Sequence, residues 1–258
     1  MSVVVLTSAS GAPGVTTTTL GLAYTWPRPV IAIEADPIGG SAMLAGFFKG
    51  FQTPGQGIVD LLLAQRAGRL AEQFPTTLIG IKSTNAAVLP GPRSHAQAHS
   101  ALDLWGQLGL VWRTLGNTGT DVLVDAGRLG MESYPEALLG TADLVLLVTR
   151  SNLPALAAAQ QWTERALQTR ELHPEAPEWA LLVVDPGHPY DNREIATTLG
   201  LPVLSTLGLD PRRAAFFSHG GTKFRRRSAL GRDLDRVGRD IRAKLASIRE
   251  LLDPKEAK

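Results

Sequence analysis

The segment from residue 3 to residue 36 constrains the fold more than any other part of the chain. It opens with the apolar run Val3 to Leu6, and a loop of small residues rich in Ser and Gly follows. Thr16 to Tyr24 then shows helical spacing of apolar side chains, and Val30 to Ile33 is a second apolar run. Short runs that are apolar throughout are typical of strands buried on both faces of a parallel sheet. The segment therefore predicts an α/β fold in which backbone N–H groups of the loop face an anion.

The loop matches the phosphate-binding pattern G-x-x-x-x-G-K-[ST] only in part. Ala9 stands at the first glycine and Gly14 at the second, while Val15 and Thr16 stand at the lysine and the hydroxyl positions. The lysine normally brings a point charge to the terminal phosphates of a nucleotide, and valine cannot supply it. Pro13 also removes one backbone donor from the loop. The sequence thus predicts a phosphate loop that has kept its hydroxyl and lacks its lysine.

Length and composition limit the classes of protein to consider. We expect a single domain over residues 1–258, because this length is ordinary for one open-sheet domain. No apolar run approaches the roughly 18–20 residues that span a bilayer. The chain opens on a strand rather than on a basic and apolar leader, so we expect no secretory signal. Cysteine is absent, which leaves no disulfide or thiolate metal site and fits a cytoplasmic location.

The basic residues gather near the C-terminal end. Residues 211–249 contain twelve Lys/Arg and three Asp, a net charge of +9, whereas the rest of the chain has 14 basic and 21 acidic residues, a net charge of −7. A basic amphipathic helix is predicted over about 231–252, with an apolar stripe at intervals of three and four residues: Leu234, Val237, Ile241, Leu245, Ile248 and Leu252.

Three interpretations of this helix stay open. In the first, which we favour, the apolar stripe docks on the domain and the arginines are solvated. In the second, the basic side chains bind nucleic acid without sequence preference and with strong salt dependence. In the third, the helix lies on a membrane surface, but its apolar face lacks the aromatic residues typical of interfacial helices.

Taken together, the motifs resemble the ParA/MinD family of P-loop ATPases, whose deviant Walker A loop reads KGGVGKTT. The stretches SGAPGVTTTTLGLA (10–23) and VIAIEADPIGG (30–40) are similar to that loop and to the D-x-D-P-type motif after it. The blocks DVLVD (121–125) and ADLVLLVTR (142–150) are similar to later family motifs in order and spacing. The resemblance covers about residues 2–220. It implies an open, mostly parallel twisted sheet with helices on both faces.

The resemblance also implies ATP and Mg²⁺ as cofactors. Ser10 stands where the family has its extra signature lysine, and Val15 stands at the ordinary one. Thr16 takes the place of the magnesium-binding hydroxyl, Asp36 that of the catalytic, metal-side aspartate, and Glu34 that of its companion acid. The loop residues expected to bind nucleotide are Ser10, Gly11, Ala12, Pro13, Gly14, Val15, Thr16 and Thr17.

Later motifs add residues to the expected site. Asp125 ends an apolar strand as a Walker B acid does, so the resemblance implies a metal site of Thr16, Asp36 and Asp125. Where the family ends a strand with an adenine-binding asparagine, this chain has Asp185, which can accept a hydrogen bond but cannot donate one. Pro211 lies in LGLDPRRAA (207–215), which resembles the family loop beside the base.

Two arginines at predicted strand ends bear on the missing lysines. Arg128 and Arg150 both fall near the phosphate edge, so either could replace a lysine. The alternative, which we favour on the sequence alone, is that both are solvated or paired with an acid, because arginine is common on protein surfaces.

Three hypotheses about function follow. The first is a ParA/MinD-like ATPase that forms a homodimer across ATP–Mg and positions or partitions DNA or a cellular machine. Its turnover would be slow, because positioned charge is missing. The second is a nucleotide-independent pseudo-ATPase, a scaffold or localisation factor like the CpaE/TadZ proteins of pilus and secretion systems. The third is a different enzyme that uses Glu34 and Asp36, for which no catalytic arrangement in the sequence argues. In the first two, DNA or a partner protein would meet the basic C-terminal region.

Overall fold

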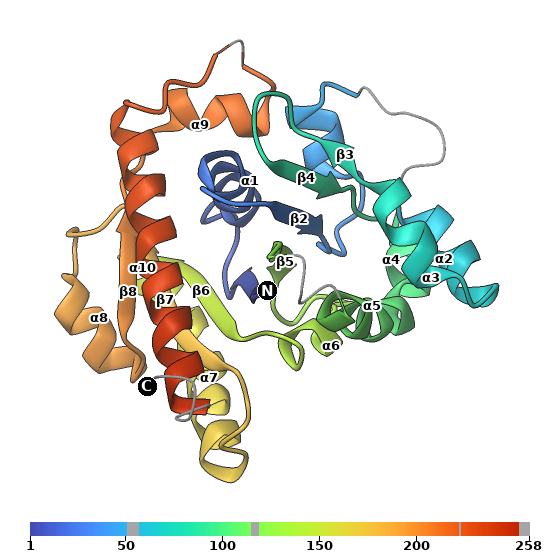
Figure 1. Cartoon of the computed structure of the whole chain (residues 1–258). Coiled ribbons are helices and arrows are strands. Elements are labelled where there is room, and N and C mark those ends of the chain that lie inside the picture. The colour runs from blue at the N-terminus through green and yellow to red at the C-terminus, as the bar shows by residue number, and fades with distance from the viewer. Residues whose placement is uncertain (51–56, 115–118, 222, 253–258) are drawn as a thin grey trace.

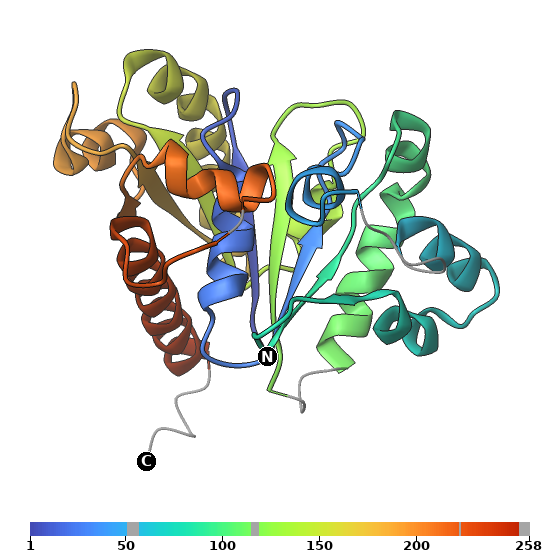
Figure 2. The ribbon, with the colours of Figure 1, turned by 90° about the horizontal axis from the view of Figure 1, so that it is seen from above.

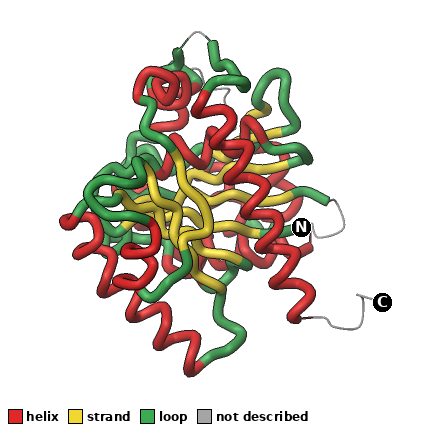
Figure 3. Tube along the Cα trace, turned by 90° about the vertical axis from the view of Figure 1, so that its left-hand side faces the viewer, coloured by secondary structure: helices red, strands yellow, loops and turns green. Residues whose placement is uncertain are grey.

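The computed structural model describes residues 1–50, 57–114, 119–221 and 223–252. Within these residues eight strands form one sheet (Figure 3). The strands are β1 (Val3–Ser8), β2 (Val30–Glu34), β3 (Ile79–Gly80), β4 (Ala86–Leu89), β5 (Asp121–Arg128), β6 (Leu144–Arg150), β7 (Glu178–Val184) and β8 (Val203–Leu207). Their order is β3-β4-β2-β5-β1-β6-β7-β8, and each neighbouring pair is parallel except β3 and β4. The expected open, mostly parallel sheet is confirmed.

Helices surround the sheet in the described part of the chain (Figures 1 and 2). The α-helices are α1 (Val15–Thr25), α2 (Ile58–Arg66), α3 (Leu70–Gln73), α4 (His95–Ser100), α5 (Leu102–Thr114), α6 (Glu136–Leu139), α7 (Leu153–Leu172), α8 (Asn192–Leu199), α9 (Pro211–Ser218) and α10 (Ala229–Leu252). A π-helix, η1 (Met43–Phe47), and a 3-10 helix, η2 (Phe74–Thr77), complete the set.

The buried strands supply two separate cores, one on each face of the sheet. Val5 and Ile33 point to the face covered by α2, α5, α6, α7 and α8. Val4 and Leu6 point to the opposite face, which α1, η1, α9 and α10 cover. Alternate side chains of a strand lie on opposite faces, so runs apolar at every position are what a doubly covered sheet requires.

Helix α10 is amphipathic and packs through its apolar stripe. Leu234, Val237, Ile241 and Leu245 are buried in the same core as α1, and the helix lies alongside α1 and β8 (Figure 1). Gly21 of α1 leaves room for this contact, because a Cβ there would lie 2.8 Å from Leu234 Cδ1. This arrangement matches the first of the three interpretations of the helix. In the described part of the chain, no helix is both long and apolar enough to cross a membrane.

Six aromatic rings join the segment after Asp36 to the helices beside it. Phe47 packs edge-to-face on Phe216 with a centroid distance of 5.6 Å, and Tyr24 of α1 packs on Phe216 at 5.5 Å. Gly46 lies so close to α9 that a Cβ would come within 2.2 Å of the Ser218 carbonyl oxygen. The rings of the cluster are Tyr24, Phe47, Phe48, Phe216, Phe217 and Phe224.

Several local expectations differ from the structure. The strand expected over 77–81 is reduced to β3, because Thr77 belongs to η2. The stretch VLPGP (88–92) resembles a family loop at the carboxyl edge of the sheet, but its first two residues belong to β4, which lies beside β2. The segment at 211–215, expected as a loop, begins α9, where the Asp210 side chain accepts a hydrogen bond from Arg213 N. The helix expected over 101–115 is α5, and residue 115 lies outside the described residues.

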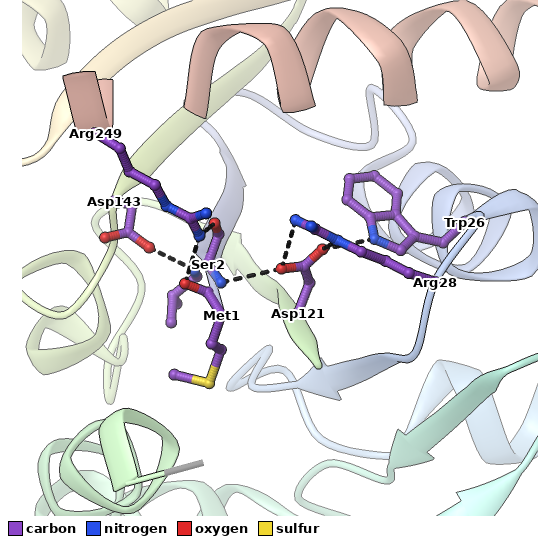
Figure 4. Close-up of polar contacts among 8 residues, drawn as sticks. Met1, Ser2, Trp26, Arg28, Asp121, Asp143 and Arg249 are labelled. Carbon is purple, nitrogen blue, oxygen red and sulfur yellow. Dashed lines mark hydrogen bonds and ion pairs between the residues drawn. The ribbon is translucent and has the colours of Figure 1, made fainter. Parts of the chain in front are cut away.

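A buried carboxylate organises the amino-terminal edge of the sheet (Figure 4). Asp121 is 1% exposed and accepts hydrogen bonds from Ser2 N at 3.0 Å and Trp26 Nε1 at 2.9 Å, as well as two from Arg28. Beside it, Arg249 of α10 donates to the carbonyl oxygen of Met1 at 2.7 Å. Asp121 therefore ties the first strand, the turn after α1 and β5 together.

We predict that Asp121→Ala lowers the free energy of unfolding by roughly 3 kcal/mol, because buried donors lose their acceptor and the Arg28 charge loses its partner. Urea unfolding measures this change. Glu171→Ala, an exposed acid on α7, is the control and should stay within about 0.5 kcal/mol of the unmodified protein. Equal stability of the two variants would contradict the prediction.

Candidate functional site

A cleft of about 430 Å³ opens at the carboxyl end of β1, between the loop before α1 and the end of β5. Strand β1 lies between β5 and β6. The next strand in sequence, β2, lies on the β5 side, whereas β6, β7 and β8 lie on the other side, so the direction of strand order changes at β1. Such a switch point at the carboxyl edge is where open α/β sheets bind ligands. The lining residues are Ser8, Gly11, Ala12, Pro13, Gly14, Val15, Thr16, Thr17, Asp36, Ile38, Gly127 and Arg128.

The loop turns sharply into α1 at Gly14. Its φ of 103° lies in the left-handed region, which glycine adopts without steric cost. No side chain caps the helix, so the first N–H groups of α1 have no side-chain acceptor at the cap position. An uncapped N-terminus that faces a cleft favours an anion through its N–H groups and its dipole.

Asp125 lies buried beside this cleft. It is fully buried in the second half of β5, which continues to Arg128, and it pairs with Leu6 of β1 and Glu34 of β2 in the sheet register. Its Oδ1 accepts a hydrogen bond from Gly127 N at 3.0 Å, whereas its buried Oδ2 has no hydrogen-bond partner among the residues that the structure describes. Burial raises the pKa of Asp125 to about 7; the Thr16 side chain opposes this shift, and the charges of Asp36 and Glu34 add to it.

Glu34 is also buried, but its oxygens are satisfied. It accepts hydrogen bonds from Ser41 Oγ, from Met43 N at 3.0 Å and from Gly91 N at 3.0 Å. Burial raises the pKa of Glu34, although these three hydrogen bonds favour its charged form. Glu34 is not among the residues that line the cleft, so here it holds the segments at 41–43 and 91 rather than facing a ligand.

Asp36 faces the cleft and is partly buried. Its Oδ1 accepts a hydrogen bond from Ile38 N at 2.9 Å. Burial raises the pKa of Asp36, while the Ile38 hydrogen bond and the Arg128 charge lower it. Gly127 permits this placement, because it has a φ of 68° and a Cβ there would lie 2.6 Å from Asp36 Cγ.

Arg128 is the cation that the structure brings to the cleft. It is exposed, lines the cleft opposite the phosphate loop and donates a hydrogen bond to Met131 Sδ at 2.7 Å. Arg150 ends β6 and does not line the cleft. Of the two arginines considered from the sequence, only Arg128 is therefore positioned to meet a bound anion.

The structure brings most of the expected loop residues together. Gly11 to Thr17 and Asp36 line the cleft, and Asp125 lies beside it. Ser10 is half-exposed and outside the lining. Val15, the first residue of α1, lines the cleft, but it is only 7% exposed and packs in the core between α1 and the sheet.

The two residues expected near the base do not line this cleft. Asp185 is exposed after the end of β7, with its N–H bound to the Leu207 carbonyl, and Pro211 is exposed at the start of α9. Neither lines the cleft. Sequence reasoning did not single out Ser8, Ile38 and Gly127, which do line it. For Gly127, the available signal was its position two residues after the Walker B acid.

The oxygen atoms at the site fit Mg²⁺. This ion prefers oxygen ligands and usually combines one or two carboxylates with water and phosphate oxygens. Asp125 Oδ2 is a buried acceptor without a donor, and Thr16 and Asp36 lie near it. The described residues hold no group of three or more His, Cys, Asp or Glu side chains able to bind a metal. A magnesium ion here would therefore depend on oxygen atoms of water and of a phosphate.

Comparison with solved structures gives the fold. MinD of Pyrococcus horikoshii OT3, solved with Mg-ADP, superposes with a TM-score of 0.73 at 17% identity, covering 96% of this chain and 98% of that one. A ParA family ATPase from Chlorobium tepidum TLS superposes with a TM-score of 0.69 at 16% identity, covering 93% and 97%. The chain has the MinD/ParA fold. A variant of Cyanothece McdA in complex with ATP shares it, with a TM-score of 0.68, 16% identity and coverage of 93% and 96%.

Sequence comparison adds less. No family model matches the chain. The uncharacterized protein Rv3660c of Mycobacterium tuberculosis is 34% identical over 130 residues, which is 45% of this chain. The chain covers 35% of the length of that relative. The MinD/ParA fold is thus supported by structure across nearly the whole chain, whereas the sequence match extends over about half of it.

We predict that the free energy of unfolding falls as the pH rises from about 4 to about 7, and that it falls more steeply than in the variant Asp125→Asn. The pKa of Asp125 is about 7 in the folded chain and lower when unfolded. The folded state therefore binds more protons in this window, and stability is lost as the pH rises, by up to about 4 kcal/mol. Urea unfolding across the window, in buffer with a magnesium chelator, measures the difference. The control Asp60→Asn should keep the unmodified slope; parallel profiles for Asp125→Asn and the unmodified protein would contradict the prediction.

Proposed function

We propose that the protein is a ParA/MinD-like positioning or partition protein that binds ATP–Mg weakly. The observation that carries the proposal is the unpaired, buried Oδ2 of Asp125, which lies beside Thr16 and Asp36 next to an uncapped helix N-terminus. A bound magnesium ion would neutralise charge on the phosphates. It would also relieve the electrostatic cost of the buried acid.

Each group in the cleft has a proposed role. Backbone N–H groups at the start of α1 bind phosphate oxygens, and Thr16, Asp36 and Asp125 hold the ion. Arg128 supplies part of the charge that the absent lysines would bring, because it faces the loop across the cleft. Asp36 orients the attacking water. On the base side we propose Asp185 and Pro211, and in the assembled state a homodimer.

The same geometry makes the site weak. Val15 packs in the core with α1, so its position offers the phosphates no charge. Ser10 is a small neutral side chain outside the cleft lining. Removing positioned charge from phosphoryl transfer costs orders of magnitude in rate. We therefore propose that hydrolysis is slow or absent.

We predict that the protein binds ATP–Mg and that Arg128→Gln weakens this binding about tenfold or more, because a charge-assisted hydrogen bond is removed. Arg150→Gln is the matched control and should bind as the unmodified protein does. Isothermal titration calorimetry measures all three. Asp36→Ala should also weaken binding. Equal weakening in both arginine variants would contradict the role of Arg128.

A second candidate function is a nucleotide-independent scaffold, such as a localisation factor of a pilus or secretion system. It is favoured by one observation: neither position that the family fills with a lysine presents a charge to the cleft. The titration separates the two functions. If the unmodified protein binds no ATP–Mg at millimolar concentration, the proposal of a nucleotide-binding protein fails and the scaffold is supported.

The basic C-terminal region provides a surface for DNA or for a partner protein. Helix α10 docks through its apolar stripe, so Arg232, Arg239 and Arg249 remain exposed, as do Arg225 and Arg227 before the helix. Because twelve basic residues gather over 211–249, we propose that duplex DNA binds there without sequence preference. A membrane surface is a weaker candidate, since the apolar stripe is buried against the domain.

We predict that changing the exposed residues Arg212, Arg225 and Arg227 to Gln weakens duplex binding. The slope of log K against log salt should fall by roughly one for each phosphate that the variant no longer neutralises. Fluorescence anisotropy over a range of salt concentrations measures both quantities. The matched control changes three exposed basic residues outside 211–249, Arg66, Arg69 and Lys82, and should have little effect. Equal weakening in both triple variants would place DNA elsewhere.

A further inference from the structure

A second hollow lies at the end of α1 that is remote from the cleft. Its volume is about 250 Å³, and it opens between the C-terminal end of α1 and α10. Helix α1 starts at the cleft and runs eleven residues, so roughly 16 Å separates its two ends. The lining residues are Thr25, Trp26, Pro27, Arg226, Leu234, Asp235, Gly238, Arg239 and Arg242.

The hollow carries an excess of positive charge. Three of its lining residues are arginines, and Asp235 is the one acid among the described residues that line it. Asp235 is already paired with Arg226, whose Nη2 lies 2.8 Å from Asp235 Oδ1. The ion pairs of the described residues include neither Arg239 nor Arg242. Two guanidinium groups therefore face the hollow without a carboxylate partner.

Arg242 is held in place before any ligand arrives. Its guanidinium lies over the Trp26 ring, 5.3 Å from the centroid. Trp26 is in turn fixed by its hydrogen bond to Asp121, the contact that Figure 4 shows beside Arg28. Burial lowers the pKa of Arg242, and the charges of Arg28 and Arg239 lower it further, while Asp121 and Asp235 oppose them. An anion in the hollow would relieve this repulsion.

Gly238 keeps the hollow open. It lies in the middle of α10, where glycine is a poor helix former compared with alanine. A Cβ at this position would lie 3.5 Å from Arg242 Nη1 and 3.6 Å from Trp26 Cζ3, both ordinary contact distances. Packing therefore does not require glycine at position 238, and a methyl group there would occupy the space between the arginine and the tryptophan.

We propose that this hollow is a binding site for a phosphate group, held by the guanidinium groups of Arg239 and Arg242. Planar guanidinium forks match phosphate oxygens in bidentate geometry. The group belongs either to a free phosphorylated molecule or to a nucleic-acid backbone. The site goes beyond the proposed function, because it lies at the opposite end of α1 and needs no nucleotide in the cleft.

The test is a calorimetric titration of the full chain with pyrophosphate at constant ionic strength, without magnesium or ATP. Binding should weaken about tenfold or more in Arg242→Gln, which removes charge-assisted hydrogen bonds. It should persist in Arg66→Gln, an exposed arginine that lines neither the hollow nor the cleft. No binding to the unmodified protein at millimolar pyrophosphate would overturn the proposal. Weakening in Arg66→Gln equal to that in Arg242→Gln would overturn it too.

Gly238→Ala separates loss of the site from loss of the fold. The substitution should raise the melting temperature by about 2 to 4 °C, because alanine favours the helix. It should also weaken pyrophosphate binding, because its methyl group enters the hollow. A variant that is more stable and binds pyrophosphate as tightly as the unmodified protein would contradict the assignment.

Competition identifies the source of the phosphate. If pyrophosphate displaces duplex DNA and Arg242→Gln weakens both ligands, the hollow holds a phosphate of the nucleic-acid backbone. If DNA stays bound while pyrophosphate occupies the hollow, the site serves a free phosphorylated molecule. Both outcomes keep the site, and neither depends on ATP binding in the cleft.

Discussion

Parallel pairing of β2 and β5 brings Glu34, the last residue of β2, beside Asp125 of β5, and the cost of burying both carboxyl groups shapes the site. Glu34 and Asp125 are neighbours in the sheet register, so two buried carboxyl groups lie close together and their negative charges repel each other. The chain meets this cost in two ways. It surrounds Glu34 with three donors, and it leaves one oxygen of Asp125 without a donor. Glu34 consequently stabilises neighbouring loops, while Asp125 keeps the free acceptor that the proposed magnesium site requires.

Much of the fold could be predicted from the sequence, because apolar runs of strand length alternate with helical spacing. The carboxyl edge followed from the same pattern, and so did the loop residues from Gly11 to Thr17. The direction of side chains could not be predicted. Nothing in the sequence shows that Val15 packs into the core or that Glu34 binds Ser41 and Gly91, since these contacts depend on segments far apart in the chain. Strand β4 and helix α9 were missed because each is short and begins or ends beside a proline.

The protein has the MinD/ParA fold, but the positive charge near the cleft comes from a different position than the family's two lysines. Neither lysine position supplies a cation, yet Arg128 reaches the cleft from β5. At the other end of α1, arginines of α10 and of the loop before it gather around Trp26. One helix thus separates two regions suited to anions, a cleft built mainly from backbone N–H groups and a hollow built from side chains. Because the two regions use different groups, a substitution that abolishes anion binding in one need not affect binding in the other.

The aromatic cluster has a mechanical consequence. Residues 43–48 begin a few positions after Asp36, and Phe47 packs edge-to-face on Phe216 and stacked on Phe217 of α9, which precedes α10. Interlocked rings in a close-packed core resist gradual sliding and favour discrete arrangements. Residues 43–48 are therefore held in place by the helix that precedes α10, so a movement of this segment would require the rings of α9 to repack.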